Sequence, residues 1–279
     1  MNSSTPRQRG SKERLADIAS QVGQWREITG QATAQDVQPG SSLDADDQAF
    51  PLYPASHHAW HGISHAVDHL DMFMHPLVES NLSFPLAPQT LARSGVLGAA
   101  HALWVLDATT RPVRQIRALR LAHEEFQNER KAYEQLANSG AATAEMAAIV
   151  ATRVEWIGRA VKAGVALGAT ATQVQAKLVE TDVIDDVLRR YEVAHPSPDD
   201  HLLRTYRLIW RMHSGVAHGF RWPVTYRTDF TNAVMEGEEQ RQLGGLVTND
   251  EDQLITSAIA MSLLIGRAFD LYNNRRVKH

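Results

Sequence analysis

DDHLLRTYRLIWRMHSGVAHG, residues 199–219, has the clearest helical period in the chain. At 100° per residue its apolar side chains form one contiguous stripe: Leu202, Leu203, Tyr206, Ile209, Trp210, Val216 and Ala217. The opposite stripe holds three arginines, a serine and a histidine: Arg204, Arg207, Arg211, Ser214 and His218. Exposed helix faces usually mix both signs of charge, so this face is unusual for a merely solvated surface. Gly219 supplies the expected end of the helix.

The same period continues along most of the sequence and predicts an all-α fold, a multi-helix up-and-down bundle with antiparallel neighbours. Three regions are expected: a disordered N-terminus (1–12), a short helix and linker (13–55), and the bundle (56–279), with a loop or hairpin excursion over 220–247. Helices are predicted at about 13–28, 57–79, 89–106, 112–136, 141–163, 199–217 and 248–275, with one or two short ones within 173–200.

Composition excludes several classes of site and sets a condition on nucleic-acid binding. The 279 residues include no cysteine, which rules out disulfides, thiolate metal sites and cysteine nucleophiles. The net charge is −4, so binding to nucleic acid requires a local cationic patch. No signal peptide is apparent, and the longest apolar run, 258–266, is shorter than the ~20 residues that span a bilayer. We therefore expect a cytoplasmic protein without a membrane partner.

Residues 211–218, RMHSGVAH, resemble the Arg-x4–6-His signature of the HEPN superfamily (higher eukaryotes and prokaryotes nucleotide-binding). The surrounding WRMHSGVAHG looks like the Arg-x-x-Ser-x-x-x-His-Gly version found in uncharacterised bacterial HEPN-like proteins. Residues 91–107 and 114–121 are similar to bundle helices of that group, so the resemblance covers about 56–275. One position departs from it, because related sequences often carry glutamate where this chain has Leu97.

This resemblance implies a metal-independent endoribonuclease without a cofactor, acting as a toxin or phage-defence effector, with a possible antitoxin partner. It also implies a homodimer in which two such helices face each other across one cleft. The residue chemistry is compatible with that reaction. Histidine titrates near neutrality and can act as general acid or base on RNA, while arginine binds phosphate through its planar fork. The residues assigned to catalysis are Arg211 and His218, with Arg207, Ser214 and Arg204 in support.

Two Arg–His pairs fit the signature, and the helical wheel separates them. Arg207 and His213 lie about 120° apart, and His213 falls inside the apolar stripe, where we expect a buried, hydrogen-bonded histidine. Arg211 and His218 are seven residues apart, which places them within ~20° of each other with ~10.5 Å of rise between them. A long arginine side chain spans much of that gap, so Arg211 and His218 are the better pair.

Non-catalytic interpretations of the same residues remain open. A histidine at a helix C-terminus often only interacts with the last carbonyls, and arginines often pair with acids of a neighbouring helix. The alternative to the ribonuclease is therefore a HEPN-like module that binds nucleotide or protein without cleaving it.

Other chemistry-bearing residues give weaker signals. Six histidines fall within 57–76, and His61, His65 and His69 have the i, i+4 spacing that can chelate a divalent metal, although a polar contact face is the preferred interpretation. Glu192-Val-Ala-His195 is a lone Glu-x-x-His pair and no partner motif accompanies it. Arg114, Arg117 and Arg120 are expected to form salt bridges on a bundle surface. Arg93 could orient a phosphate, although a structural ion pair is the preferred interpretation.

Overall fold

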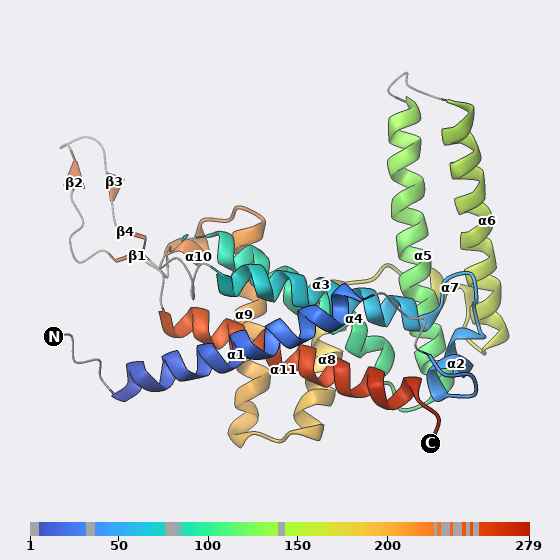
Figure 1. Ribbon diagram of the computed structural model, residues 1–279. Helices are drawn as coiled ribbons and strands as arrows, with labels where there is room; N and C mark the ends of the chain where they lie inside the picture. The colour runs from blue at the N-terminus through green and yellow to red at the C-terminus, as the bar shows by residue number, and fades with distance from the viewer. Residues whose placement is uncertain are drawn as a thin grey trace. The chain divides into compact units, whose positions relative to one another are not determined.

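The computed structural model describes residues 6–31, 37–75, 84, 86–138, 143–225, 228–229, 235–236, 242–243, 246–247 and 251–279. The fold is all-α, as predicted (Figure 1). The long helices are α1 (Pro6–Gly30), α3 (Ala55–His75), α4 (Ala87–Leu106), α5 (Arg111–Leu136), α6 (Ala144–Ala166), α8 (Glu180–Ala194), α9 (His201–Ala217) and α11 (Glu251–Arg276). The short ones are α2 (Ser42–Asp47), α7 (Ala171–Gln175), the 3-10 turn η4 (Pro198–Asp200) and α10 (Trp222–Thr225).

The predicted excursion over 220–247 contains α10 and two short antiparallel ladders. Strand β1 (Thr228–Asp229) pairs with β4 (Leu246–Val247), and β2 (Met235–Glu236) pairs with β3 (Gln242–Leu243). The nested order of these pairs is that of a hairpin.

Helix boundaries differ from the prediction mainly near the N-terminus. Helix α1 begins at Pro6, whereas residues 1–12 were expected to be disordered; residues 1–5 lie outside the described part. Helix α2 lies within the predicted linker, where the Ser41 hydroxyl accepts the Asp44 N–H at 3.1 Å and caps the first turn. The predicted end of the helix over 57–79 and the start of the last helix at 248 also fall outside the described residues.

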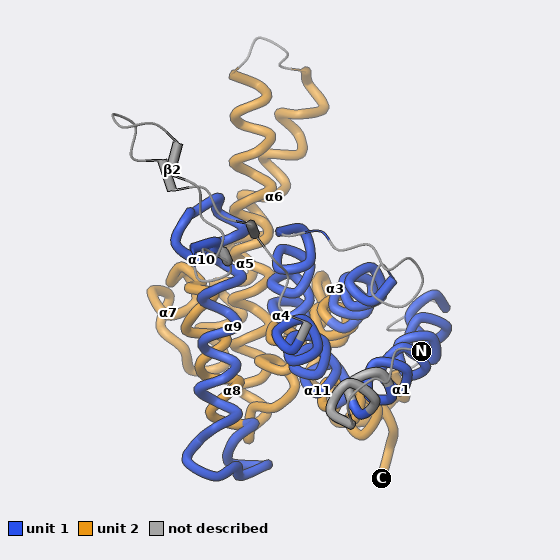
Figure 2. Tube along the Cα trace, turned by 90° about the vertical axis from the view of Figure 1, so that its left-hand side faces the viewer, with its two compact units in different colours: residues 1–32, 63–99, 191–266 blue, residues 33–62, 100–190, 267–279 orange. Residues whose placement is uncertain are grey.

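The chain divides into two compact units, each built from three segments (Figure 2). The first comprises residues 1–32, 63–99 and 191–266, and the second comprises 33–62, 100–190 and 267–279. Boundaries fall inside α3, α4, α8 and α11, so each of these helices contributes residues to both units.

Close helix packing forms the core of the first unit. Trp25 of α1 is buried, and its indole lies against Gly266 of α11. Gly95 of α4 is buried so closely against α11 that an added Cβ would lie 2.7 Å from the sulfur of Met261. The absence of a side chain at Gly95 therefore permits this close approach.

The second unit is organised around the antiparallel helices α5 and α6, which run side by side (Figure 1). Their core consists of Phe50, Leu119, Ala122, Phe126 and Ala160. Farther along the pair, Arg153 binds both carboxylate oxygens of Glu129, at 2.5 and 2.7 Å, and its guanidinium lies 4.1 Å from the ring centre of Trp156.

A buried ion pair fastens α2 to α5. Arg114 Nε donates to Asp46 Oδ2 at 2.6 Å and Nη2 donates to Oδ1 at 3.1 Å. Both side chains are at least 95% buried, since 5% of Arg114 and 1% of Asp46 remain exposed. Burial raises the pKa of Asp46, although the hydrogen bond and charge of Arg114 oppose this. The expectation of a surface salt bridge at Arg114 was therefore wrong, because α2 covers the arginine.

Among the described residues, Asp252–Arg276 of α11 has the length and composition of a membrane-crossing helix. Of the most apolar part of this helix, 61% is buried inside the protein. Buried core helices of soluble proteins have the same length and composition.

Candidate functional site: the polar face of helix α9

Side chains and backbone at both ends define the limits of α9. At its start, Ser197 Oγ accepts the Leu202 N–H at 3.1 Å, and Glu192 Oε1 accepts from both the N–H and the hydroxyl of Ser197 at 2.6 Å. These bonds lower the pKa of Glu192. Glu192 thus stabilises the turn between α8 and α9. His195, of the same Glu-x-x-His sequence, lies against Tyr191 with ring centres 4.7 Å apart.

The C-terminus of α9 is closed by backbone hydrogen bonds of the Schellman type. The Phe220 N–H donates to Gly215 O and the Gly219 N–H donates to Val216 O, both at 2.9 Å. Gly219 has a φ of 72°, a conformation that glycine adopts without strain. His218 is the last residue before this turn, so the helix presents its ring at the very end of the polar face.

Burial separates the two faces of α9 largely as the sequence predicted. The buried residues are Tyr206, Ile209, Trp210, Met212, His213, Gly215 and Val216. On the other face Arg204, Arg211 and His218 are exposed, and Arg207 and Ser214 are half-buried. The candidate catalytic pair, Arg211 and His218, therefore lies on the solvent side of the helix. Ala217, expected on the apolar stripe, is exposed because the helix ends there.

His213 is a core histidine, as predicted. It is 2% exposed, and its Nε2 lies 3.3 Å from the hydroxyl of Ser257 on α11. Nearby, the Tyr206 hydroxyl donates to the carbonyl of Ala260 at 2.9 Å. Because these contacts join α9 to α11 within the first unit, the Arg207–His213 pair is not a surface site.

Arg93 of α4 joins the polar face of α9. Its guanidinium carbon lies 4.9 Å from the ring centre of Trp210, and its Nε donates to Ser214 Oγ at 3.4 Å. A cation over an indole is held electrostatically by the ring. This arginine therefore adds a fourth guanidinium beside those of α9, and its position depends on Ser214 and Trp210.

Two aromatic residues directly after α9 were not singled out by the sequence analysis. Phe220 is 57% exposed and Trp222 is 43% exposed, with the exposed Arg221 between them. The Trp222 indole lies over Gly215, where an added Cβ would lie 3.0 Å from the ring. The ring centres of Phe220 and His218 are 6.1 Å apart. The alternation of aromatic and basic residues was the signal that the sequence offered for this extension.

Charge on this face is only partly neutralised. Arg204 and Arg211 make no ion pair or hydrogen bond with the residues that the structure describes. Several charged side chains elsewhere are paired, as the contacts of α5 and α6 show. The α9 face can therefore accept an anion without first breaking an ion pair of these two arginines.

The histidines of α3 do not assemble a metal site in the described part of the chain. His69 Nδ1 lies 2.8 Å from the His65 carbonyl oxygen, and the rings of these two residues are 4.1 Å apart. Within that part, no group of three or more histidine or acidic side chains has a geometry that fits a metal ion.

Comparison with known proteins adds no assignment: no family model matches the chain, and neither a curated protein nor a solved structure matches it.

Proposed function

We propose that the polar face of α9 binds the phosphate backbone of RNA and that Arg211 and His218 cleave the bound strand without a metal ion. One observation carries this proposal. Arg211 and His218 are both exposed on one helix face, together with Arg204, and neither Arg204 nor Arg211 forms an ion pair with the residues that the structure describes. In a chain of net charge −4, this local excess of positive charge meets the condition for phosphate binding.

The reaction that fits these residues is internal transesterification. His218 as general base removes the proton of a ribose 2′-hydroxyl, and the 2′-oxygen attacks the adjacent phosphorus. Arg211 stabilises the charge on the phosphate oxygens. The bond to the 5′-oxygen breaks, leaving a 2′,3′-cyclic phosphate and a 5′-hydroxyl after that oxygen is protonated. In a homodimer, the same histidine of the second copy would supply this proton.

The surroundings of the pair support binding to single-stranded RNA. Phe220 and Trp222 are exposed beside the cationic face, and unpaired bases stack on such rings. Arg93 and Arg207 extend the positive surface for flanking phosphates. The resemblance of residues 211–218 to the HEPN signature agrees with this assignment. A cytoplasmic toxin or phage-defence role, with an antitoxin as partner, remains part of the same proposal.

A second candidate function is nucleotide or RNA binding without cleavage. The imidazole of His218 has one ring contact within the described part of the chain, to Phe220, and no hydrogen bond orients it. Catalytic bases are commonly oriented by a further group. This observation favours a binding module unless dimerisation or RNA itself orients the ring.

One experiment separates the two candidates. The full chain is mixed with a 5′-labelled single-stranded RNA in EDTA, and binding and cleavage are measured for wild type, His218→Ala and Arg211→Ala. The exposed His57→Ala and Arg189→Ala serve as matched controls. We expect His218→Ala to lower the cleavage rate by at least about 100-fold with little change in binding, and Arg211→Ala to weaken both.

The other outcomes of this experiment reject either the ribonuclease or the α9 face as the site. Binding without cleavage by wild type supports the second candidate and rejects the ribonuclease. Equal behaviour of wild type, both α9 variants and the controls rejects the α9 face as the site.

A further inference from the structure

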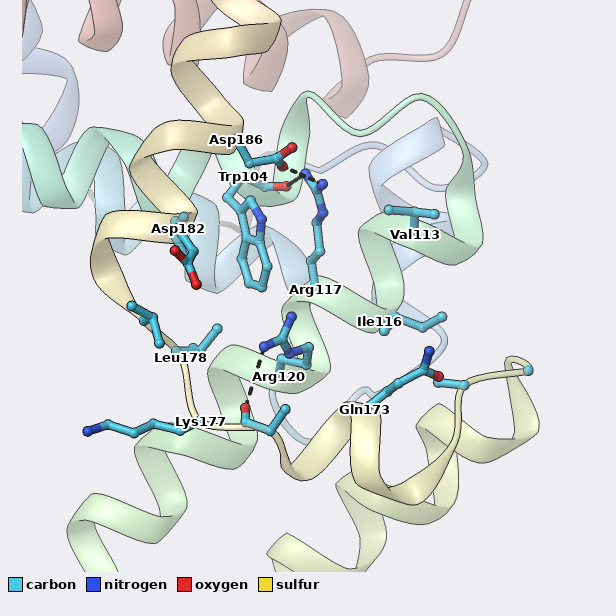
Figure 3. A pocket seen from close by; sticks show the side chains of 15 residues that line it. Trp104, Val113, Ile116, Arg117, Arg120, Gln173, Lys177, Leu178, Asp182 and Asp186 are labelled. Atoms are coloured by element: carbon cyan, nitrogen blue, oxygen red, sulfur yellow. Dashed lines mark hydrogen bonds and ion pairs between the residues drawn. The ribbon is translucent and has the colours of Figure 1, made fainter. Parts of the chain in front are cut away.

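A pocket lies wholly within the second unit and has no role in the proposed function. Its cavity of about 600 Å³ is bordered by α4, α5, α7 and α8 and by the segments that join α6 to α7 and α7 to α8 (Figure 3). That volume is within the range of small-molecule sites. Trp104, Ala169 and Val183 are buried at its base, whereas Lys177 and Val179 are exposed at its rim.

Apolar side chains form two opposite parts of the wall. Figure 3 shows Val113 and Ile116 of α5 on one side and Leu178 on the other. Val113 and Val179 remain 38% and 48% exposed. Large apolar side chains left exposed around a cavity indicate that an apolar group can displace water there.

One arginine of this pocket is already neutralised. Arg117 Nη2 donates to Asp186 Oδ2 at 2.5 Å, and its Nη1 donates to the Trp104 carbonyl at 2.7 Å. The same carboxylate also receives Arg190 Nε at 3.3 Å. The charge of Asp186 is thus neutralised by two arginines, so this carboxylate does not repel an incoming anion.

Arg120 retains unused hydrogen-bonding capacity. Its Nη2 reaches the Ala176 carbonyl only at 3.5 Å, and its buried Nε has no acceptor in the described structure. Its guanidinium carbon lies 5.3 Å from the ring centre of Trp104, which holds it at the pocket. Burial lowers the pKa of Arg120, but an arginine stays charged at neutral pH. Arg120 is half-buried and Glu124 acts on its charge, but a buried N–H without an acceptor is costly, and an anion that accepts from Nε removes that cost.

We propose that this pocket binds a small amphipathic anion, whose carboxylate or phosphate is held by Arg120 and Lys177 and whose apolar body packs between Val113, Ile116 and Leu178. The planar fork of Arg120 fits two oxygens of either head group. Asp182, the other acid of the lining, forms no ion pair with Arg117 or Arg190 and lies at the exposed rim. Two cations against this acid leave the pocket net positive.

The test uses 1-anilinonaphthalene-8-sulfonate, a planar amphipathic anion, titrated by fluorescence against the folded full chain. Arg120→Gln is expected to raise its Kd by about 10-fold, because a charge-assisted hydrogen bond is lost. Lys177→Gln, at an exposed position where folding is not at risk, is expected to raise it by about threefold. Arg189→Gln, an exposed arginine of α8 outside the lining, is the matched control and leaves Kd unchanged.

Displacement by three eight-carbon compounds then identifies the ligand class. Octanoate or octyl phosphate should displace the probe, and their ranking distinguishes a carboxylate from a phosphate ligand; octanol should compete at least about 10-fold more weakly, because it lacks the charge. Equal displacement by octanol, or an unchanged Kd in both Arg120→Gln and Lys177→Gln, would overturn the proposal.

Discussion

Helices α5 and α9 both carry several arginines, but they place them in opposite surroundings. On α5, Arg114 is bound to Asp46 inside the protein and Arg117 is bound to Asp186. On α9, Arg204 and Arg211 are exposed and form no ion pair with described residues. Arg114 and Arg117 hold structural elements together, whereas Arg204 and Arg211 are available to a ligand. Whether an arginine can bind a ligand therefore depends on whether an acid of the same chain already neutralises it, and the residue type alone does not show this.

A helical wheel cannot show which arginines are ion-paired, because their partners are far away in the sequence. The acid that binds Arg114 is 68 residues away in sequence, and the acid that binds Arg117 is 69 residues away. A wheel shows only neighbours within one helix, so it detects the one-sided face of α9 but not the partners of α5.

Removing a paired arginine should produce the largest effect. Arg114→Met leaves the buried Asp46 carboxylate with only the 3.8 Å ion pair to the exposed Arg111, so we expect the free energy of unfolding to fall by about 3–5 kcal/mol. Arg211→Met should change it by less than about 0.5 kcal/mol, because that side chain is exposed. Urea denaturation of the two variants measures the contrast.

The double variant Asp46→Leu with Arg114→Met separates charge from packing. Because it removes both charges, it should recover part of the stability that Arg114→Met loses. If Arg114→Met and Arg211→Met destabilise equally, the distinction between the two helices does not hold.

The buried His58 and the exposed His57 also lie in opposite surroundings, and we expect a second, smaller effect from this difference. His58 of α3 is buried against the ring of Tyr53, with ring centres 4.5 Å apart. Burial, aided by the charges of His101, His61 and His57, lowers its pKa to about 3. The unfolded chain takes up a proton near pH 6.5, so the folded state loses stability as the pH falls from 6.5 towards 3. At pH 5 the loss from this group is about 2 kcal/mol relative to neutral pH.

Urea denaturation at pH 7 and pH 5 checks this expectation. His58→Gln, which does not titrate, should show a pH dependence flatter by about 2 kcal/mol than wild type. His57→Gln, one residue earlier and exposed, should keep the wild-type pH dependence. An equal pH dependence in wild type and His58→Gln would show that the burial of His58 does not affect its protonation.

The sequence predicted the parts of the fold that depend on local pattern. Apolar spacing identified α3 to α6, α9 and α11, and it placed His213 in the core and Arg211 outside. It missed α2, whose six residues are too few for a period and depend on the Ser41 cap and on Arg114. The pocket was missed for a related reason, since Trp104, Arg120 and Lys177 come together only through packing.

The smallest expected effect is a change in the salt dependence of RNA binding. Arg204→Gln on α9 should reduce the slope of log K against log salt concentration by about 0.7, the value for one phosphate contact on a single strand. Arg130→Gln on α5 is the matched control, because Arg130 donates to Glu134 at 2.9 Å and is not free to bind phosphate. Its slope should equal that of wild type. Fluorescence anisotropy at several salt concentrations measures both slopes. Equal slopes for the two variants would mean that RNA does not distinguish Arg204 from the ion-paired Arg130.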